Sequence, residues 1–347
     1  MSEKLLEVKD LAVSYHGYAG EVQSVRRVTF DVMKGETLAV VGESGCGKSV
    51  TAKSIMKLIK TPPAEIKEGS QILFNGEDVL KFDKKRLSQY RGGEAAIIFQ
   101  DALAALNPTM TVGKQIMENI LHHSKMSKKE AQAQAVELLR MVGIPQPEQR
   151  VKQYPHEFSG GMRQRVMIAI AFACNPQLLI ADEPTTALDV TIQAQIMDLI
   201  KDLQQEKGTS VILITHDLGV VANIAHRIVV MYSGKIVERG NNMDIFHNPK
   251  HPYTWALLSS LPQLGVKNEP LYSIQGAPPN LFVEIKGDAF APRNPKALKI
   301  DFVKRPPFFE VTPTHKARTW LLDPRAPKVD PPEHIRTLRE KGVNRIG

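Results

Sequence analysis

Cysteine and long apolar runs are scarce in this sequence. Its 347 residues contain two cysteines, Cys46 and Cys174, too few for a disulfide framework or a cysteine-rich metal site. The longest apolar runs, around 178–181 and 211–214, fall far short of the ~18 residues that a membrane-spanning helix requires. The chain also starts Met-Ser-Glu-Lys, with no apolar leader. We therefore expect an unprocessed cytoplasmic chain with both thiols reduced.

Basic charge is concentrated at one end of the chain. The formal net charge is +8, but residues 286–347 alone hold 14 Lys/Arg against 7 Asp/Glu, together with 9 of the 23 prolines. Residues 1–285 are consequently close to neutral. A basic tail suits contact with a membrane surface or an acidic partner, or serves solubility alone.

The length of 347 residues predicts one large or two modest domains, and the apolar pattern predicts an α/β protein. Short apolar strands alternate with helices, as in a doubly wound sheet, and residues 103–161 read as an inserted helical segment. Turn signals between 61 and 80 indicate short strands there. Strands are predicted at 5–15, 25–32, 37–41, 97–99, 178–181 and 211–215, and helices at 48–59, 160–174, 191–206 and 218–225.

A phosphate-binding loop follows the strand at 37–41. The segment Gly42-Glu-Ser-Gly-Cys-Gly-Lys-Ser49 fits the pattern G-x-x-x-x-G-K-[ST] without a departure. Its glycines let backbone amides approach phosphates, while Lys48 neutralises phosphate oxygens and Ser49 offers a hydroxyl to Mg²⁺. Cys46 lies among these amides next to Lys48, so we expect its thiolate to be favoured and its alkylation to block ATP binding.

Polar side chains stand at the ends of three other predicted strands. Asp182 and Glu183 follow Leu-Leu-Ile-Ala, where open α/β sheets bind ligands. Asp182 suits a magnesium ion, and Glu183 can polarise a water aligned with the γ-phosphate. His216 and Gln100 end two further strands. The first is predicted to contact the γ-phosphate, and the second the metal or the attacking water.

A Ser-Gly-Gly at residues 159–161 opens the predicted helix at 160–174. The N-terminus of a helix binds anions through its backbone N–H groups. The chain therefore carries two phosphate-binding helix starts, which indicates a nucleotide clamp made by two chains.

With these motifs in order, residues 5–240 resemble the ABC-transporter ATPases. The resemblance implies a RecA-like P-loop ABC nucleotide-binding domain over 1–240, with an antiparallel β subdomain and an α-helical subdomain at about 103–160. Residues 241–347 form a C-terminal extension. In the family's signature, Leu-Ser-Gly-Gly-Gln is more usual, and here Phe158 and Met162 differ.

The resemblance also implies roles for individual residues. The Q-loop is Gln100, the D-loop is 187–189, and the switch histidine is His216. The residues implied to bind ATP are Tyr15, Gly42, Glu43, Ser44, Gly45, Cys46, Gly47, Lys48, Ser49 and Val50, with Ser159, Gly160, Gly161 and Asp189 covering the ATP of a partner subunit; Ser49, Gln100 and Asp182 hold Mg²⁺, and Glu183, His216 and Gln100 are catalytic.

Three later segments are similar to the oligopeptide and dipeptide importer ATPases: 183–195, 248–258 and 275–279. Residues 40–45, Val-Val-Gly-Glu-Ser-Gly, and residues 287–294 look most like D-type subunits of oligopeptide permeases. This implies ATP hydrolysis that drives oligopeptide import, on the cytoplasmic face of a prokaryotic membrane. The implied partners are a second, nonidentical ATPase subunit, two transmembrane permease subunits and an extracellular peptide-binding protein, without nucleic acid.

The extension departs from many of these relatives, which carry four cysteines there and bind an iron–sulfur cluster. Asp288, Asn294, Asp301 and Thr319 stand at those positions. Such clusters need cysteine thiolates, so no cluster is predicted. Instead the extension is expected to fold by packing of its aromatic residues, Phe290, Phe302, Phe308, Phe309 and Trp320.

Other functions compete with peptide import. Dipeptide, nickel or another small cargo would fit the same motifs. An ABC exporter is disfavoured by 248–258 and the tail. A soluble ABC ATPase acting on nucleic acid ordinarily needs two cassettes in one chain or a long coiled coil, and neither is present.

Overall fold

The computed structural model describes residues 3–18, 20–186, 188–261, 274–333 and 335. It divides into two compact units. Unit 1 comprises residues 1–6, 32–36 and 73–214, and unit 2 comprises residues 7–31, 37–72 and 215–347. None of the helices described is long and apolar enough to cross a membrane.

Unit 1 contains three parallel strands that end side by side. β7 (Ala95–Ile98) pairs with β8 (Leu178–Asp182), and β8 pairs with β9 (Ser210–Thr215). Every residue of β8 and β9 is buried, as their uninterrupted apolar character predicts. In register, Ile98 lies opposite Ala181, which lies opposite Leu213. The residues that follow each strand therefore emerge at one edge of the sheet.

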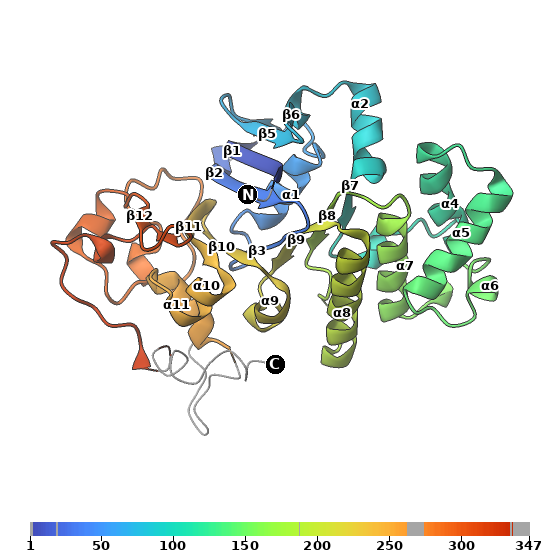
Figure 1. Ribbon diagram of the computed structural model, residues 1–347. Coiled ribbons are helices and arrows are strands. Elements are labelled where there is room, and N and C mark those ends of the chain that lie inside the picture. The colour runs from blue at the N-terminus through green and yellow to red at the C-terminus, as the bar shows by residue number, and fades with distance from the viewer. Residues whose placement is uncertain (1–2, 19, 187, 262–273, 334, 336–347) are drawn as a thin grey trace. The chain divides into compact units, whose positions relative to one another are not determined.

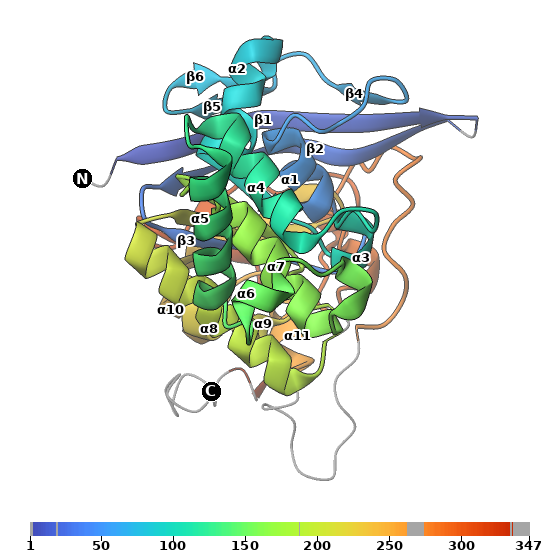
Figure 2. The ribbon, with the colours of Figure 1, turned by 90° about the vertical axis from the view of Figure 1, so that its right-hand side faces the viewer.

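The predicted helical segment is present in unit 1. Its helices α4, α5 and α7 pack on one another, beside α6 (Figures 1 and 2). Capping explains where two of them begin, because Thr111 caps α4 and Ser127 forms a capping box with Glu130 at the start of α5. The bounds in unit 1 are β5 (Gln71–Phe74, beginning in unit 2), β6 (Glu77–Asp78), η1 (Val79–Lys81), α2 (Lys84–Gln89), η2 (Tyr90–Glu94), α3 (Ala102–Ala105), α4 (Val112–His123), α5 (Lys128–Met141), α6 (Pro147–Arg150), η3 (Pro155–Glu157), α7 (Gly160–Phe172) and α8 (Val190–Lys207).

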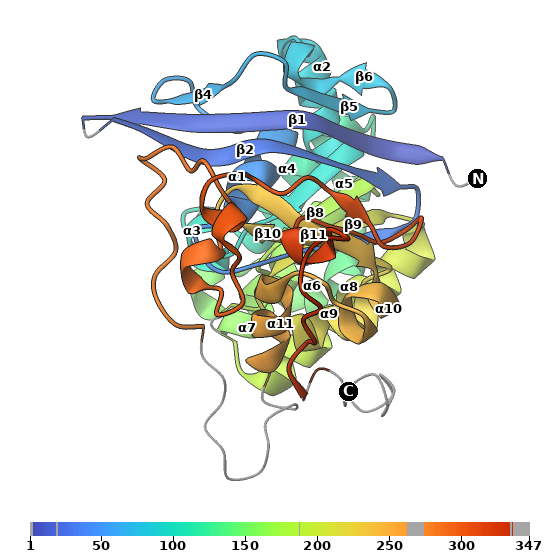
Figure 3. The same ribbon diagram turned by 90° about the vertical axis from the view of Figure 1, so that its left-hand side faces the viewer.

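Unit 2 holds most of two long strands, β1 (Lys4–Gly17) and β2 (Gly20–Met33), which run side by side (Figure 3). β1 also pairs antiparallel with β4 (Ala64–Ile66). A second group of strands has the order β12 (Phe309–Glu310), β13 (Lys316–Ala317), β11 (Lys235–Asn241), β10 (Arg227–Tyr232) and β3 (Thr37–Val41). In this group only β10 and β3 are parallel.

The core of unit 2 joins the extension to the strand that precedes the phosphate loop. Ala39 and Val41 of β3 share a buried cluster with Phe246, Tyr253 and Phe290 from beyond residue 240. The remaining elements of this unit are α1 (Lys48–Ile55), α9 (Leu218–Ile224), α10 (Asn242–His247), α11 (Pro252–Ser259), η5 (Ala291–Arg293), η6 (Lys299–Phe302) and η7 (Trp320–Leu322).

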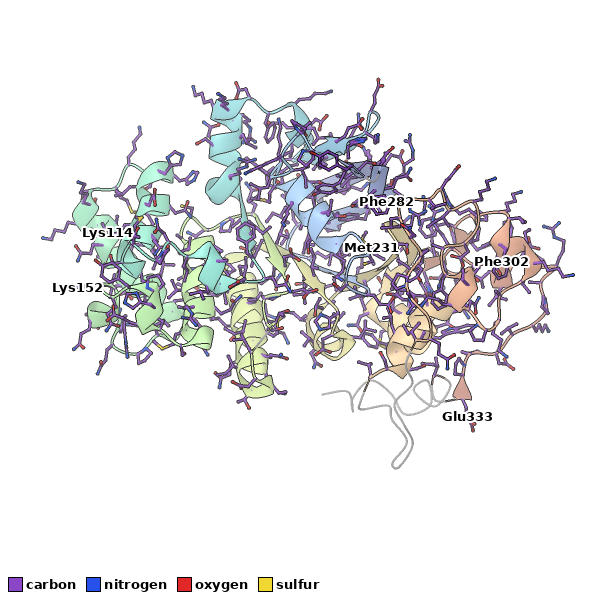
Figure 4. All side chains as sticks on the ribbon, turned by 180° about the vertical axis from the view of Figure 1, so that it is seen from behind. Lys114, Lys152, Met231, Phe282, Phe302 and Glu333 are labelled. Atoms are coloured by element: carbon purple, nitrogen blue, oxygen red, sulfur yellow. The ribbon has the colours of Figure 1, made fainter. Side chains whose placement is uncertain are left out.

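The predicted strands and helices are present, with shifted ends. α1 stops at Ile55 rather than near 59, because Met56 leaves the helical region and Lys57 takes a positive φ of 50°. The expectation for the aromatic residues was wrong at one position. Phe290 and Trp320 are buried, but Phe302 is 56% exposed and projects from the extension (Figure 4).

Candidate nucleotide-binding and catalytic residues

The phosphate loop in unit 2 has a backbone that only glycine allows at two positions. Gly42 has φ 152°, and a Cβ there would lie 2.2 Å from the carbonyl oxygen of Met231. Gly47 has φ 101°, and its Cβ would lie 2.5 Å from the carbonyl oxygen of Ser24. The loop is therefore held closely against β10 and β2, with no side chains at these points to cover its amides.

Lys48 closes this loop. Its Nζ donates hydrogen bonds to the carbonyl oxygens of Gly42 at 2.7 Å and Glu43 at 3.0 Å, and only 4% of its surface is exposed. Gly47 offers no side-chain cap to α1, while Ser49 and Val50 occupy its half-buried first turn. Backbone amides and one ammonium group are donors that suit a nucleotide phosphate.

The expectation of a favoured Cys46 thiolate was wrong. Cys46 is 4% exposed, and burial raises the pKa of its thiol, although the charge of Lys48, 3.9 Å away, works in the opposite direction. Desolvation outweighs the neighbouring cation. The exposed residues of the loop are Ser44 and Gly45 instead.

In unit 1 the structure brings two of the predicted site residues, Gln100 and Glu183, into hydrogen-bond contact. Asp182 ends β8 and is 4% exposed, and Glu183 follows it with a positive φ of 49°. The Glu183 carboxylate oxygen Oε2 accepts hydrogen bonds from Gln100 Nε2 and Thr186 Oγ1, each at 3.0 Å. Thr186 was missed by sequence reasoning. Its position three residues after Glu183 was the available signal.

His216 and Tyr15 lie in unit 2. His216 immediately follows β9 and is exposed, while the neighbouring Asp217 caps α9 by accepting hydrogen bonds from Gly219 and Val220. Tyr15 is half-buried on β1, opposite Ala64.

The Ser-Gly-Gly at residues 159–161 begins α7 in unit 1 as predicted. Ser159 is its N-cap, and its Oγ accepts a hydrogen bond from Met162 N at 3.4 Å. Ser159 and Gly160 are exposed and Gly161 is half-buried, whereas Phe158 is 3% exposed and anchors the turn. Position 158 therefore requires an apolar side chain.

Another predicted partner-facing residue, Asp189, caps α8 through a 2.9 Å hydrogen bond from Ile192 N. It is exposed. Ala187 of the same expected loop lies outside the described residues.

The predicted magnesium ligands offer only oxygen donors. Ser49 supplies a hydroxyl, Asp182 a buried carboxylate and Gln100 an amide. Among the described residues, no group of three or more His, Cys, Asp and Glu side chains is arranged to hold a metal ion. This chemistry fits Mg²⁺, which commonly binds one or two protein oxygens and completes its shell with phosphate and water.

Comparison with known proteins decides the family. The family model described as ABC transporter matches residues 25–186, and the one described as oligopeptide/dipeptide transporter, C-terminal region, matches residues 237–300. The oligopeptide transport ATP-binding protein OppD of Bacillus subtilis is 59% identical over 98% of this chain and 95% of its own length. This chain belongs to the ABC transporter family. It is an ABC ATPase, and the expected family and fold class are confirmed.

Other ABC proteins agree with this assignment. The dipeptide transport ATP-binding protein DppD of Lactococcus lactis is 56% identical over 96% of this chain and 95% of its own length. Among solved structures, the ATP-binding cassette MJ0796 bound to ADP and Pi in a dimeric post-hydrolysis state gives a TM-score of 0.61 at 27% identity. It covers 68% of this chain, and 98% of MJ0796 is matched.

This ABC ATPase lacks the ligands for an iron–sulfur cluster in its extension. Both cysteines lie before residue 175. At the four positions considered, each side-chain oxygen accepts a hydrogen bond from a nearby backbone N–H: Asp288 from Phe290, Asn294 from Lys296, Asp301 from Leu298 and Thr319 from Leu321. These hydrogen bonds stabilise local turns. Oxygen donors engaged in this way do not fit a cluster that requires thiolates.

Proposed function

We propose that this chain is the ATP-binding subunit of an importer that hydrolyses ATP to drive oligopeptides across the cytoplasmic membrane. The observation that carries the proposal is the 59% identity to OppD over 98% of the chain, which includes the extension. The relative that is named for dipeptide transport is 56% identical, so dipeptide is the alternative cargo.

In this proposal the phosphate loop binds the phosphates of ATP. Lys48 and the amides of residues 42–50, except that of Glu43, which donates to the Tyr253 hydroxyl, neutralise and orient them, while Tyr15 stacks on the adenine. Ser49, Asp182 and Gln100 would hold Mg²⁺, which, when bound, supplies positive charge to the phosphate oxygens.

Hydrolysis is assigned to Glu183. Its carboxylate takes the proton of the attacking water, and Gln100 and Thr186 fix the carboxylate through their hydrogen bonds. His216 contacts the γ-phosphate.

Assembly completes the site. Residues 159–161 and Asp189 cover ATP held by a second, homologous ATPase subunit, so the working form is a heterodimer. We assign residues 1–240 to the ATPase domain and 241–347 to the extension. Two permease subunits dock on the helical segment at about 103–160, where Lys114 and Lys152 are exposed (Figure 4), and an extracellular protein delivers the peptide.

The test is reconstitution of the chain with its permease subunits and binding protein in vesicles. Uptake of a labelled oligopeptide should require ATP and should be lost with Glu183→Gln. The matched control is Glu310→Gln, which removes an exposed carboxylate paired with Lys316. ATP-independent uptake, or uptake that survives Glu183→Gln, would refute the proposal; uptake of dipeptide alone would favour the alternative cargo.

A further inference from the structure

Within unit 2, a side chain of the extension forms hydrogen bonds with a residue of the phosphate loop. Arg293, at the end of η5, donates two parallel hydrogen bonds to Glu43, the second residue of the loop. Its Nη1 lies 2.6 Å from Oε2, and its Nη2 lies 3.0 Å from Oε1. The Arg293 side chain is 5% exposed and that of Glu43 is 26% exposed. This is the bidentate geometry of a strong guanidinium–carboxylate pair.

Arg293 is itself fixed by the extension and by β10. Its Nε donates to the carbonyl oxygen of Gln275 at 3.0 Å, and its Nη2 also donates to that of Ile274 at 3.3 Å. Nη1 donates to the hydroxyl of Tyr232 at 3.1 Å. Each of its three nitrogen atoms is therefore engaged, and the hydrogen bonds raise the pKa of Arg293. These hydrogen bonds hold the guanidinium group in one orientation.

The backbone of Glu43 is held from the same side. Its N–H donates to the hydroxyl of Tyr253, on α11, at 2.7 Å. Tyr253 is fully buried, and its ring packs against Tyr232 and Phe290 with centroids 4.5 and 5.3 Å away. The first amides of a phosphate loop would ordinarily face phosphate. Here the amide of Glu43 donates its hydrogen bond to Tyr253 of the extension instead.

The carboxylate of Glu43 places a negative charge in a loop that receives negatively charged phosphates. A carboxylate near a triphosphate repels it, and the repulsion is strongest where water is excluded. An arginine that pairs both carboxylate oxygens cancels this charge locally and keeps the side chain turned toward the extension. Glu43 lies five residues before Lys48, whose Nζ bonds the carbonyl oxygen of Glu43.

We propose that Arg293 is a positioning residue for nucleotide binding, which neutralises Glu43 and so makes the C-terminal extension part of the ATP site of its own chain. This rests on the proposed binding of ATP at the phosphate loop. Loss of the contact between the extension and Glu43 then weakens ATP binding directly.

The test measures the Kd of a fluorescent ATP analogue for the purified full chain. Arg293→Met should raise Kd roughly tenfold, because an uncompensated carboxylate then faces the phosphates. Combining it with Glu43→Gln removes that carboxylate and should return Kd to within about threefold of the unmodified protein. The Arg293→Met effect should also shrink between low and high salt, since screening weakens charge repulsion.

Two controls separate this idea from simpler ones. Arg325→Met removes an exposed arginine of the extension that pairs with Asp323, and should leave Kd unchanged. Lys48→Ala should abolish binding. If Lys48→Ala binds normally, the proposed ATP site fails. If Lys48→Ala fails to bind but Arg293→Met binds like the unmodified protein, the ATP site stands and the role of Arg293 is refuted.

A merely structural contact predicts a different pattern. It would leave the Arg293→Met, Glu43→Gln double variant as weak as Arg293→Met, with no dependence on salt, and either result overturns the proposal. Should Arg293→Met fail to fold, Glu43→Gln alone decides. It keeps the arginine and removes the negative charge that pairs with it, so its Kd should fall below that of the unmodified protein, and an equal or higher Kd would contradict the inference.

Discussion

The phosphate loop of unit 2 is built from backbone, whereas the acidic strand end of unit 1 is built from side chains. Gly42 and Gly47 leave no room for a Cβ, because carbonyl oxygens lie within 2.5 Å of its position. Glu183 instead projects from a half-buried turn and is placed by two side-chain donors. Under the proposed function, binding and hydrolysis therefore have separate structural requirements. Steric changes should damage the first, and chemical changes the second.

The largest expected effect follows from Glu183→Gln. An amide can still accept hydrogen bonds from Gln100 and Thr186 but cannot take a proton, so kcat should fall roughly 10²–10⁴-fold. The Kd for ATP and the unfolding temperature should change little. ATPase assays of the assembled complex, with nucleotide binding and calorimetry, check this. Weakened binding of the same size would erase the distinction between the two regions.

Gly47→Ala tests the other side of the comparison. A side chain at φ 101° that also meets the Ser24 carbonyl should cost about 2–4 kcal/mol of unfolding free energy or distort the loop and weaken ATP binding. Denaturant unfolding and nucleotide titration measure both. Gly76→Ala is the control, since φ there is also positive, at 84°, but no atom lies within 4 Å. Equal losses in both variants would show that steric contact is unimportant.

Thr186→Val should have a smaller effect, confined to hydrolysis. Losing one of the two hydrogen bonds to the Glu183 carboxylate should lower kcat by roughly threefold to tenfold. The similar size of valine should preserve Kd and stability. Thr186→Ser, which keeps the hydroxyl, should recover most of the activity. An inactive serine variant would mean that the methyl group, not the hydrogen bond, matters.

The smallest expected effect is on the pH dependence of stability, through Lys235, which lies in unit 2 outside the phosphate loop. Burial and the nearby Arg305, Arg26 and Arg318 lower its pKa to about 7. Between pH 7 and its ordinary pKa near 10.5, the unfolded chain binds this proton and the folded chain does not. The free energy of unfolding should therefore gain a rising contribution with pH across this window. Chemical denaturation should show the contribution flattened in Lys235→Met, and an unchanged slope would contradict it.

Local patterns made the phosphate loop and the strand ends predictable. The run at 37–41, the glycines and Lys48 are neighbours in sequence, and the uniform apolar character of β8 and β9 reports full burial. Their functional roles remain predictions, but their positions needed no long-range information.

Long-range packing was not predictable. Glu43 and Arg293 are 250 residues apart, and nothing in the sequence singles out one cation among 45 lysines and arginines. Two expectations failed for the same reason. The aromatic character of Phe302 did not reveal its exposure, and the charge of Lys48 did not reveal that burial dominates the pKa of Cys46.

The separation of binding from hydrolysis is tested most directly by the nucleotide that remains in the reconstituted transporter. The complex carrying Glu183→Gln is loaded with radiolabelled ATP, freed of unbound nucleotide and analysed for ATP and ADP. The account predicts retained, intact ATP. Recovery of ADP, or retention of no nucleotide at all, would contradict it.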